Sequence, residues 1–200
     1  MATGLRGRPR TFDRDGAVRD AARLFWRQGF SGTSTRQLAI SLGISASSLY
    51  AAFGSKAELF DEAVRTYAKR YSAIYEAAVA ETRLHTVVEH LLTDSVLEFT
   101  QPLGEHPGCL ASSAAMADEP QTLNARTFVA DLQRADEQLL RERIQQAVRS
   151  GELVEGTDGA LLTGVIQAMW QGLSFRAERG AGREELLAVA KLAASLMTSG

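Results

Sequence analysis

Three glycines divide the first 60 residues into short helical segments, and the spacing of these helix-ending residues constrains the fold more than any other feature. Apolar residues recur at helical spacing between Gly29, Gly43 and Gly54. Glycine ends helices readily because it accepts the left-handed backbone conformation. Each glycine is followed by a serine that can cap the next helix, in turn Ser34, Ser45 and Ser55. The pattern predicts a compact unit of three short helices and a fourth helix that leaves it.

The rest of the chain is also predicted to be helical. Of 200 residues, 45% are hydrophobic and only four are prolines, and no convincing alternating strand pattern occurs. The segment 101–107 contains two prolines and a glycine, so we expect a loop there. The fold class is all-α with about nine helices. Six of these follow the three-helix unit, over about 56–80, 86–100, 109–117, 120–150, 157–179 and 182–197.

Charge is distributed unevenly along the chain. The formal net charge is −2, but residues 1–70 hold twelve basic and six acidic residues, a net charge of +6. Residues 71–200 hold ten basic and eighteen acidic residues, a net charge of −8. Such asymmetry favours a basic module that binds nucleic acid, joined to an acidic module with another task. A solvated charged surface without a partner is the alternative.

The helices over 34–42 and 46–53 form a candidate helix-turn-helix around Gly43. In such a unit the second helix enters the major groove of DNA, and its first residues meet the base edges. Ala46, Ser47 and Ser48 are small enough for that approach, whereas Leu49 and Phe53 are four apart and should face the core. An ordinary helical corner is the alternative interpretation of this pair.

The stretch from Phe12 to Phe60 resembles the DNA-binding domain of TetR/AcrR-type transcriptional regulators. The resemblance runs without gaps through the segments at 21–25, 29–30, 33–39, 42–45, 48–50, 53 and 55–59. It implies a flexible basic arm at 1–10, a helix-turn-helix domain at 11–55 and a helical ligand-binding and dimerisation domain at 56–200, with the helix at 56–80 linking the two. It also implies a ligand-responsive regulator that acts as a homodimer on a palindromic operator, as a repressor released by a small molecule of unknown identity.

The resemblance carries a set of DNA-binding residues over to this chain. Arginine at position 36 suits paired contacts with guanine, and the basic arm is expected in a minor groove. The sequence departs from the family at Ala46 and at Ala51-Ala52, which leaves fewer base-reading side chains on the recognition helix. The full set is Arg8, Arg10, Thr33, Ser34, Thr35, Arg36, Ser45, Ala46, Ser47, Ser48, Tyr50 and Lys56.

Two further sets belong to the acidic part of the chain. Aromatic and sulfur-containing residues of the middle helices are candidates for the ligand pocket, with core packing as the alternative for each. They are Tyr67, Tyr71, Phe99, Cys109, Met116, Phe128, Met169 and Trp170. Apolar residues of the last two helices are candidates for the dimer interface: Leu161, Leu162, Val165, Leu173, Leu187, Val189, Leu192 and Leu196.

Other functions find less support in the sequence. No nucleotide-binding, hydrolase or metalloprotease motif occurs, so we expect neither an enzyme nor a cofactor. The spacing of the three histidines and Cys109 fits no common zinc signature, and a membrane span is not expected. One cysteine excludes a disulfide within the chain and favours the cytoplasm. Two alternatives stay open, a redox- or electrophile-sensing regulator that uses Cys109 and a helical interaction module that does not bind DNA.

Overall fold

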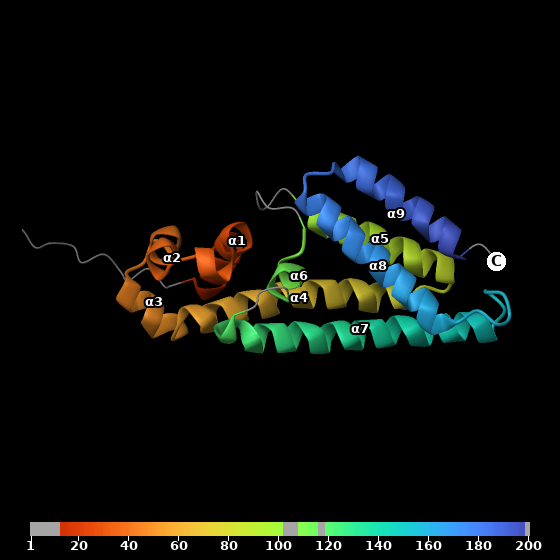
Figure 1. Ribbon diagram of the computed structural model, residues 1–200, viewed down its shortest axis with the longest axis horizontal. Coiled ribbons are helices and arrows are strands. Elements are labelled where there is room, and N and C mark those ends of the chain that lie inside the picture. Colours follow the sequence, from red (N-terminus) through yellow and green to blue (C-terminus); the bar gives the residue numbers. More distant parts are fainter. Residues whose placement is uncertain (1–12, 102–107, 116–118, 199–200) are drawn as a thin grey trace, which may run out of the picture.

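The computed structural model describes residues 13–101, 108–115 and 119–198, and this part of the chain is helical without strands. Three short helices, α1 (Arg14–Gly32), α2 (Thr35–Leu42) and α3 (Ala46–Phe53), form a head at one end of an elongated molecule (Figure 1). The helix α4 (Lys56–Val79) runs from this head into a larger helical body. The expected arm at residues 1–10 lies outside the described residues.

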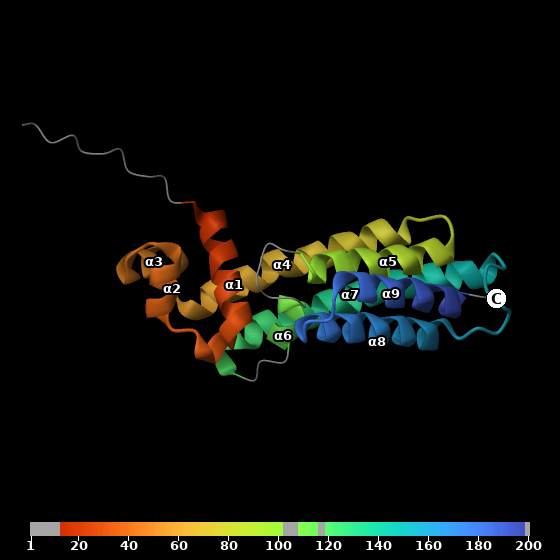
Figure 2. The same cartoon turned by 90° about the horizontal axis from the view of Figure 1, so that it is seen from above.

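The body consists of α4 and five further helices. Its elements are α5 (Leu84–Phe99), α6 (Leu110–Ala115), a 3₁₀ turn η1 (Pro120–Thr122), α7 (Leu123–Arg149), α8 (Gly159–Glu178) and α9 (Arg183–Thr198). Figure 2 shows α4, α5, α7, α8 and α9 running along the long axis of the molecule, with α6 near the head. The all-α prediction is confirmed. Most of the expected loop at 101–107 lies outside the described residues.

Local signals set the ends of the head helices. Gly29 has φ 70° and ψ 174°, which breaks α1 one turn before its last residue. Gly43 ends α2 in the left-handed conformation with φ 64°. The hydroxyls of Ser45 and Ser55 accept hydrogen bonds from the backbone N–H groups of Ser48 and Glu58, and so cap α3 and α4. The predicted starts and stops of these helices are therefore found in the structure.

A cluster of phenylalanines holds the head on α4. The rings of Phe25 and Phe30 on α1 lie 5.0 and 5.1 Å from the ring of Phe60 on α4, in edge-to-face geometry. Leu49 and Phe53 on α3 are buried in the same core, as their spacing predicts. Because α1 and α3 both pack against α4, the orientation of the head depends on where α4 lies in the body.

The body has its own aromatic centre. Tyr71 on α4, Phe99 on α5 and Trp170 on α8 are buried, with ring centroids 5.1 to 5.7 Å apart. The indole N–H of Trp170 donates to the hydroxyl of Ser95 at 2.7 Å, which satisfies a polar group that would otherwise be unpaired in the core. This cluster joins three helices and forms one side of a cavity described below.

Candidate functional site

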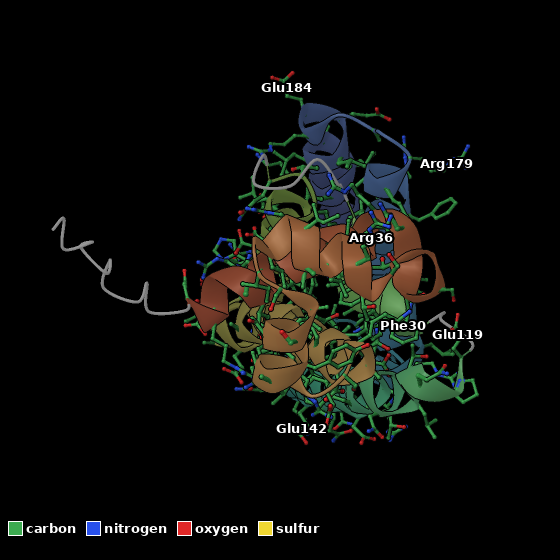
Figure 3. All side chains as sticks on the ribbon, turned by 90° about the vertical axis from the view of Figure 1, so that its left-hand side faces the viewer. Phe30, Arg36, Glu119, Glu142, Arg179 and Glu184 are labelled. Atoms are coloured by element: carbon green, nitrogen blue, oxygen red, sulfur yellow. The ribbon has the colours of Figure 1, made fainter. Side chains whose placement is uncertain are left out.

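The helices α2 and α3 meet at the turn formed by Gly43 and present their polar faces at the end of the molecule. At the start of α2, the hydroxyl of Ser34 accepts from the N–H of Gln37 at 3.2 Å, and the amide oxygen of Gln37 accepts from the N–H of Ser34 at 2.8 Å. This reciprocal capping holds the start of α2 rigidly. Arg36 follows on the exposed side of α2, and Figure 3 looks onto this end of the molecule.

The N-terminus of α3 carries three serines that are bonded to each other. The Ser45 hydroxyl accepts from the N–H of Ser48 at 3.0 Å and lies 2.8 Å from the hydroxyls of both Ser47 and Ser48. All three are exposed, as are Ala46 and Tyr50. The start of a helix attracts phosphate because its N–H groups point outward and its dipole is positive there. The arrangement offers DNA a slim, polar helix end.

Two residues of the expected DNA-binding set are used inside the protein. Thr33 is fully buried, and its hydroxyl donates to the carbonyl of Gly29 at 2.7 Å. The ammonium group of Lys56 donates to the carbonyls of Phe30 and Thr33 at 2.9 and 3.1 Å and lies 3.9 Å from the centre of the Phe30 ring. The side chains of Thr33 and Lys56 thus bond to backbone carbonyls at the broken end of α1 and just after it. Their side chains therefore serve the head itself in this conformation.

Sequence reasoning missed one residue that organises the head. The guanidinium of Arg14 donates to both carboxylate oxygens of Glu62 on α4, at 3.0 and 2.6 Å, and to the carbonyl of Ala52 at 2.5 Å. It also lies 4.6 Å from the centre of the Phe53 ring. One side chain thus joins α1, α3 and α4. Its partners are 38 and 48 residues away along the chain, so no local pattern reveals it.

A cavity opens in the body between α4, α6, α7 and α8. The space between its walls, with the adjoining open solvent included, is about 450 Å³. Its walls combine apolar side chains with amides, hydroxyls and carboxylates, as is usual for small-molecule sites. The lining residues are Ala68, Tyr71, Tyr75, Ala111, Val129, Leu132, Gln133, Asp136, Glu137, Gln167, Trp170 and Gln171.

The expected ligand-binding residues are divided by the structure. Tyr71 and Trp170 line the cavity, and Phe99 packs behind both rings. Tyr67 instead contacts Trp26 of the head, at 5.7 Å between ring centroids, and Phe128 lies under the guanidinium of Arg65. Met169 is half-buried against the core and outside the cavity wall, and Met116 lies outside the described residues.

The polar residues of the cavity are absent from the predicted set, because that set contains only aromatic and sulfur-containing residues. Asp136 on α7 is only 7% exposed, and one of its carboxylate oxygens accepts from the hydroxyl of Ser72 on α4 at 3.1 Å. Burial raises the pKa of Asp136 to about 6, with a smaller contribution from the negative charge of Glu76. The hydroxyl of Tyr75 donates to the side-chain oxygen of Gln167 at 2.9 Å.

Cys109 is buried beside this cavity, close to the hydroxyl of Tyr71. Burial raises the pKa of its thiol, so the neutral form is favoured over the reactive thiolate. This environment is that of a packed core cysteine. It disfavours the alternative in which Cys109 acts as an exposed sensor of oxidants or electrophiles.

The expected dimer residues fall into three groups. Leu161 and Val165 on α8 and Leu192 and Leu196 on α9 are 51 to 72% exposed. Leu162, Leu187 and Val189 are half-buried against the core. Leu173 is buried within the subunit, so its assignment to the interface is wrong: the residue faces the core side of α8. Phe175, which was not predicted, is 58% exposed on the same helix.

Two further properties concern the described part of the chain. No helix there is both long and apolar enough to cross a membrane. Within the same ranges, no group of three or more His, Cys, Asp or Glu side chains is arranged to hold a metal ion.

Comparison with known proteins gives consistent results. Residues 18–63 match the family model described as bacterial regulatory proteins, tetR family. The Escherichia coli K12 HTH-type transcriptional repressor ComR is 28% identical over 187 residues, which cover 92% of this chain and 89% of ComR.

Solved structures are similar to this chain as well. The regulator CifR, solved as a cysteine mutant with 26-base-pair operator DNA, is 34% identical with a TM-score of 0.80, over 94% of this chain and 98% of CifR. AibR, solved with isovaleryl coenzyme A and operator DNA, shares the fold at 16% identity with a TM-score of 0.73, over 92% of this chain and 97% of AibR.

Proposed function

Since the chain belongs to the TetR family of bacterial transcriptional regulators, we propose that it is a repressor that binds a palindromic operator and is released by a small molecule. The exposed helix pair α2–α3, with a slim polar start to α3, is the observation that supports the DNA-binding step best. The relatives are regulators of transcription, and the proposal contains no catalytic step. Operator DNA as the partner implies action in the cytoplasm.

The proposed contacts with DNA fall into two classes. Arg36 is exposed in the first turn of α2, the hydroxyls of Ser47 and Ser48 are exposed in the first turn of α3, and these groups would meet base edges in the major groove. Phosphate groups would be held by side chains and N–H groups around this surface, at Ser34, Thr35, Ser45, Ala46 and Tyr50. Arg8 and Arg10 of the arm, which lie outside the described residues, are proposed to contact DNA as well.

The repressor is proposed to act as a homodimer, as members of this family do. Exposed apolar residues occur on α8, at Leu161, Val165 and Phe175, and on the adjacent helix α9, at Leu192 and Leu196. A second copy packed on these helices would remove these residues from water. The paired heads would then read two half-sites about 34–36 Å apart, one turn of the DNA helix, or a multiple of it.

The effector is proposed to bind in the cavity between α4, α6, α7 and α8. AibR shows that this fold can accommodate a small molecule together with operator DNA. Here α4 lines the cavity and also carries the head, and α6 contributes Ala111 to the cavity while it packs on α1. An effector that prefers another position of α4 would change the spacing of the two heads. Operator affinity then falls by the free energy that couples the two sites.

Selection of bound fragments from a random DNA library tests the proposal. We expect enrichment of a sequence with twofold symmetry, because a symmetric dimer presents two identical helices α3. Ser47→Glu should abolish the enrichment by placing a negative charge against DNA, whereas Gln145→Glu, an equal charge change on an exposed part of α7, should not. Enrichment of no sequence, or equal loss in both variants, contradicts the proposal.

A further inference from the structure

The cavity in the body has an unbalanced charge. Its twelve lining residues, all within the described ranges, include the carboxylates of Asp136 and Glu137 and no Lys, Arg or His. The remaining polar groups of the wall are neutral amides and phenol hydroxyls. A ligand in this cavity would therefore meet negative charge without a compensating positive side chain in the wall.

Asp136 is the more deeply buried of the two carboxylates in the cavity wall. Asp136 is only 7% exposed, and one of its two carboxylate oxygens accepts a hydrogen bond from the Ser72 hydroxyl. The titratable groups that face it are Glu76 and Tyr75 of α4 and Glu137 of its own helix. The described residues of α6, and the cavity residues of α8, are uncharged. A buried carboxylate among like charges is costly unless an opposite charge joins it.

Aromatic rings form another part of the wall of this cavity. Tyr71 and Trp170 meet edge to face with centroids 5.5 Å apart, and Tyr75 is held beside them by its hydrogen bond to Gln167. The faces of such rings attract cations through their quadrupoles and bury apolar groups. Val129 and Leu132 complete an apolar wall on α7.

We propose that the effector is a small organic cation, with its ammonium or amidinium group at Asp136 and its apolar part against Tyr71 and Trp170. This inference rests on the proposed function, since it takes the cavity to be the effector site. The same arrangement disfavours carboxylates, phosphates and other anions, because Asp136 and Glu137 would repel them. A coenzyme A thioester, the ligand of AibR, is therefore excluded as the type of molecule for this cavity.

Three probes that share one ring but differ in charge test the proposal. Calorimetric titration of the whole protein without DNA, at about pH 8, compares 2-phenylethylammonium, 2-phenylethanol and phenylacetate. We expect the cation to bind about tenfold more tightly than the alcohol, which corresponds to about 1.4 kcal/mol, and phenylacetate to bind most weakly. The preference for the cation should shrink as the pH falls below about 6, where the Asp136 carboxylate becomes protonated.

Two variants of the same helix separate binding from folding. Asp136→Asn should bind the cation and the alcohol with similar affinity. The variant should still unfold in one cooperative thermal transition, which shows that it is folded. Asp131→Asn, an exposed aspartate paired with Arg134 on α7, should keep the preference for the cation. Tighter binding of phenylacetate, an unchanged preference in Asp136→Asn, or binding of none of the probes would overturn the proposal.

The two proposals fail in different ways. If the cation binds through Asp136 but does not release selected operator DNA, the charge preference stands and the role of the cavity as effector site fails. If DNA selection succeeds but the cavity binds the anion best, the regulator stands and the cationic effector fails.

Discussion

Two arginines of the head illustrate how position decides the role of a residue. Arg14 is bonded to Glu62 and to the carbonyl of Ala52, so it fixes α3 relative to α1 and α4. Arg36 lies exposed in the first turn of α2, where a guanidinium can meet a base. Loss of Arg14 should therefore weaken binding to every DNA sequence, by loosening the head. Loss of Arg36 should act on particular sequences.

Arg36→Ala is expected to weaken specific operator binding by about 1–3 kcal/mol and to relax the preference at one base pair, because a paired contact with guanine is lost. Gel-shift titration with operator variants measures both effects. Arg149→Ala, an exposed arginine at the far end of α7, is the control and should leave binding unchanged. An equal loss on all sequences would show that Arg36 contacts phosphate and does not read a base.

Asp136 has a consequence for stability as well as for binding. Its pKa is raised to about 6 by burial, so the folded protein binds the proton more tightly than the unfolded chain does. This group therefore destabilises the fold fully above about pH 6, and the penalty shrinks as the pH falls and disappears only at about pH 3, below the pKa of the unfolded chain.

Asp136→Asn should therefore raise the free energy of unfolding at about pH 8 by on the order of 2 kcal/mol. At about pH 3 the gain should vanish, because the aspartic acid is then mostly protonated in both states. Urea unfolding at the two pH values measures the difference. A variant that is less stable than wild type at pH 8 would show that the carboxylate is stabilised by partners beyond Ser72.

Helix ends are the main determinants at the scale of elements. Gly29, with φ 70°, breaks α1, and the ammonium of Lys56 in the first turn of α4 donates to two backbone carbonyls near that break. The end of one helix is thus tied to the beginning of another, 26 residues later. The Phe30 ring lies against the same ammonium, which adds a cation–π contact.

Lys56→Ala is expected to lower the free energy of unfolding by about 1–2 kcal/mol, because two carbonyls lose a charged donor. Thermal and urea unfolding measure this loss. The slope of log binding constant against log salt concentration should change little in this variant. If Lys56 bound a DNA phosphate instead, its loss would lower that slope by about one. Lys69→Ala, an exposed lysine on the same helix, is the matched control for stability. If Lys56→Ala left the stability unchanged but reduced the salt dependence of DNA binding, Lys56 would be a DNA-contacting residue.

The whole molecule separates two tasks along its length. The basic head occupies one end, and the exposed apolar residues of α8 and α9 lie in the body (Figure 2). The helix α4 belongs to both parts, since it packs against α1 and α3 and also against α5, α6 and α7. A change in the body can therefore reach the head through one continuous rigid element.

Substitutions in the exposed apolar residues of α8 and α9 should prevent dimerisation, and weaker DNA binding should follow from the loss of the dimer. Leu161→Asp combined with Leu192→Asp is expected to convert a dimer to a monomer in analytical ultracentrifugation. Operator affinity should then fall by more than tenfold, or about 1.4 kcal/mol, because one head reads only one half-site. Leu139→Asp, at another exposed leucine on α7, should stay dimeric. A dimer that survives the double substitution would place the interface elsewhere.

The helices of the head could be located from the sequence because their determinants are local. Gly43 and Gly54 end helices by their own backbone conformation, and Ser45 and Ser55 cap helices through bonds that span three residues. The exposed serines of α3 and its buried Leu49 and Phe53 follow from helical spacing in the same way.

The cavity and its charge were decided only by the tertiary structure. Asp136 meets Ser72 across 64 residues, and Tyr75 meets Gln167 across 92. The hydrogen bonds of Thr33 and Lys56 could not be predicted for a similar reason, since their partners depend on how α1 ends and where α4 packs. Local periodicity indicates which face of a helix is apolar, but not which helices meet there. The sequence by itself determined the helices and the family, whereas packing between distant segments determined which polar groups are buried, and hence the chemistry of the proposed effector site.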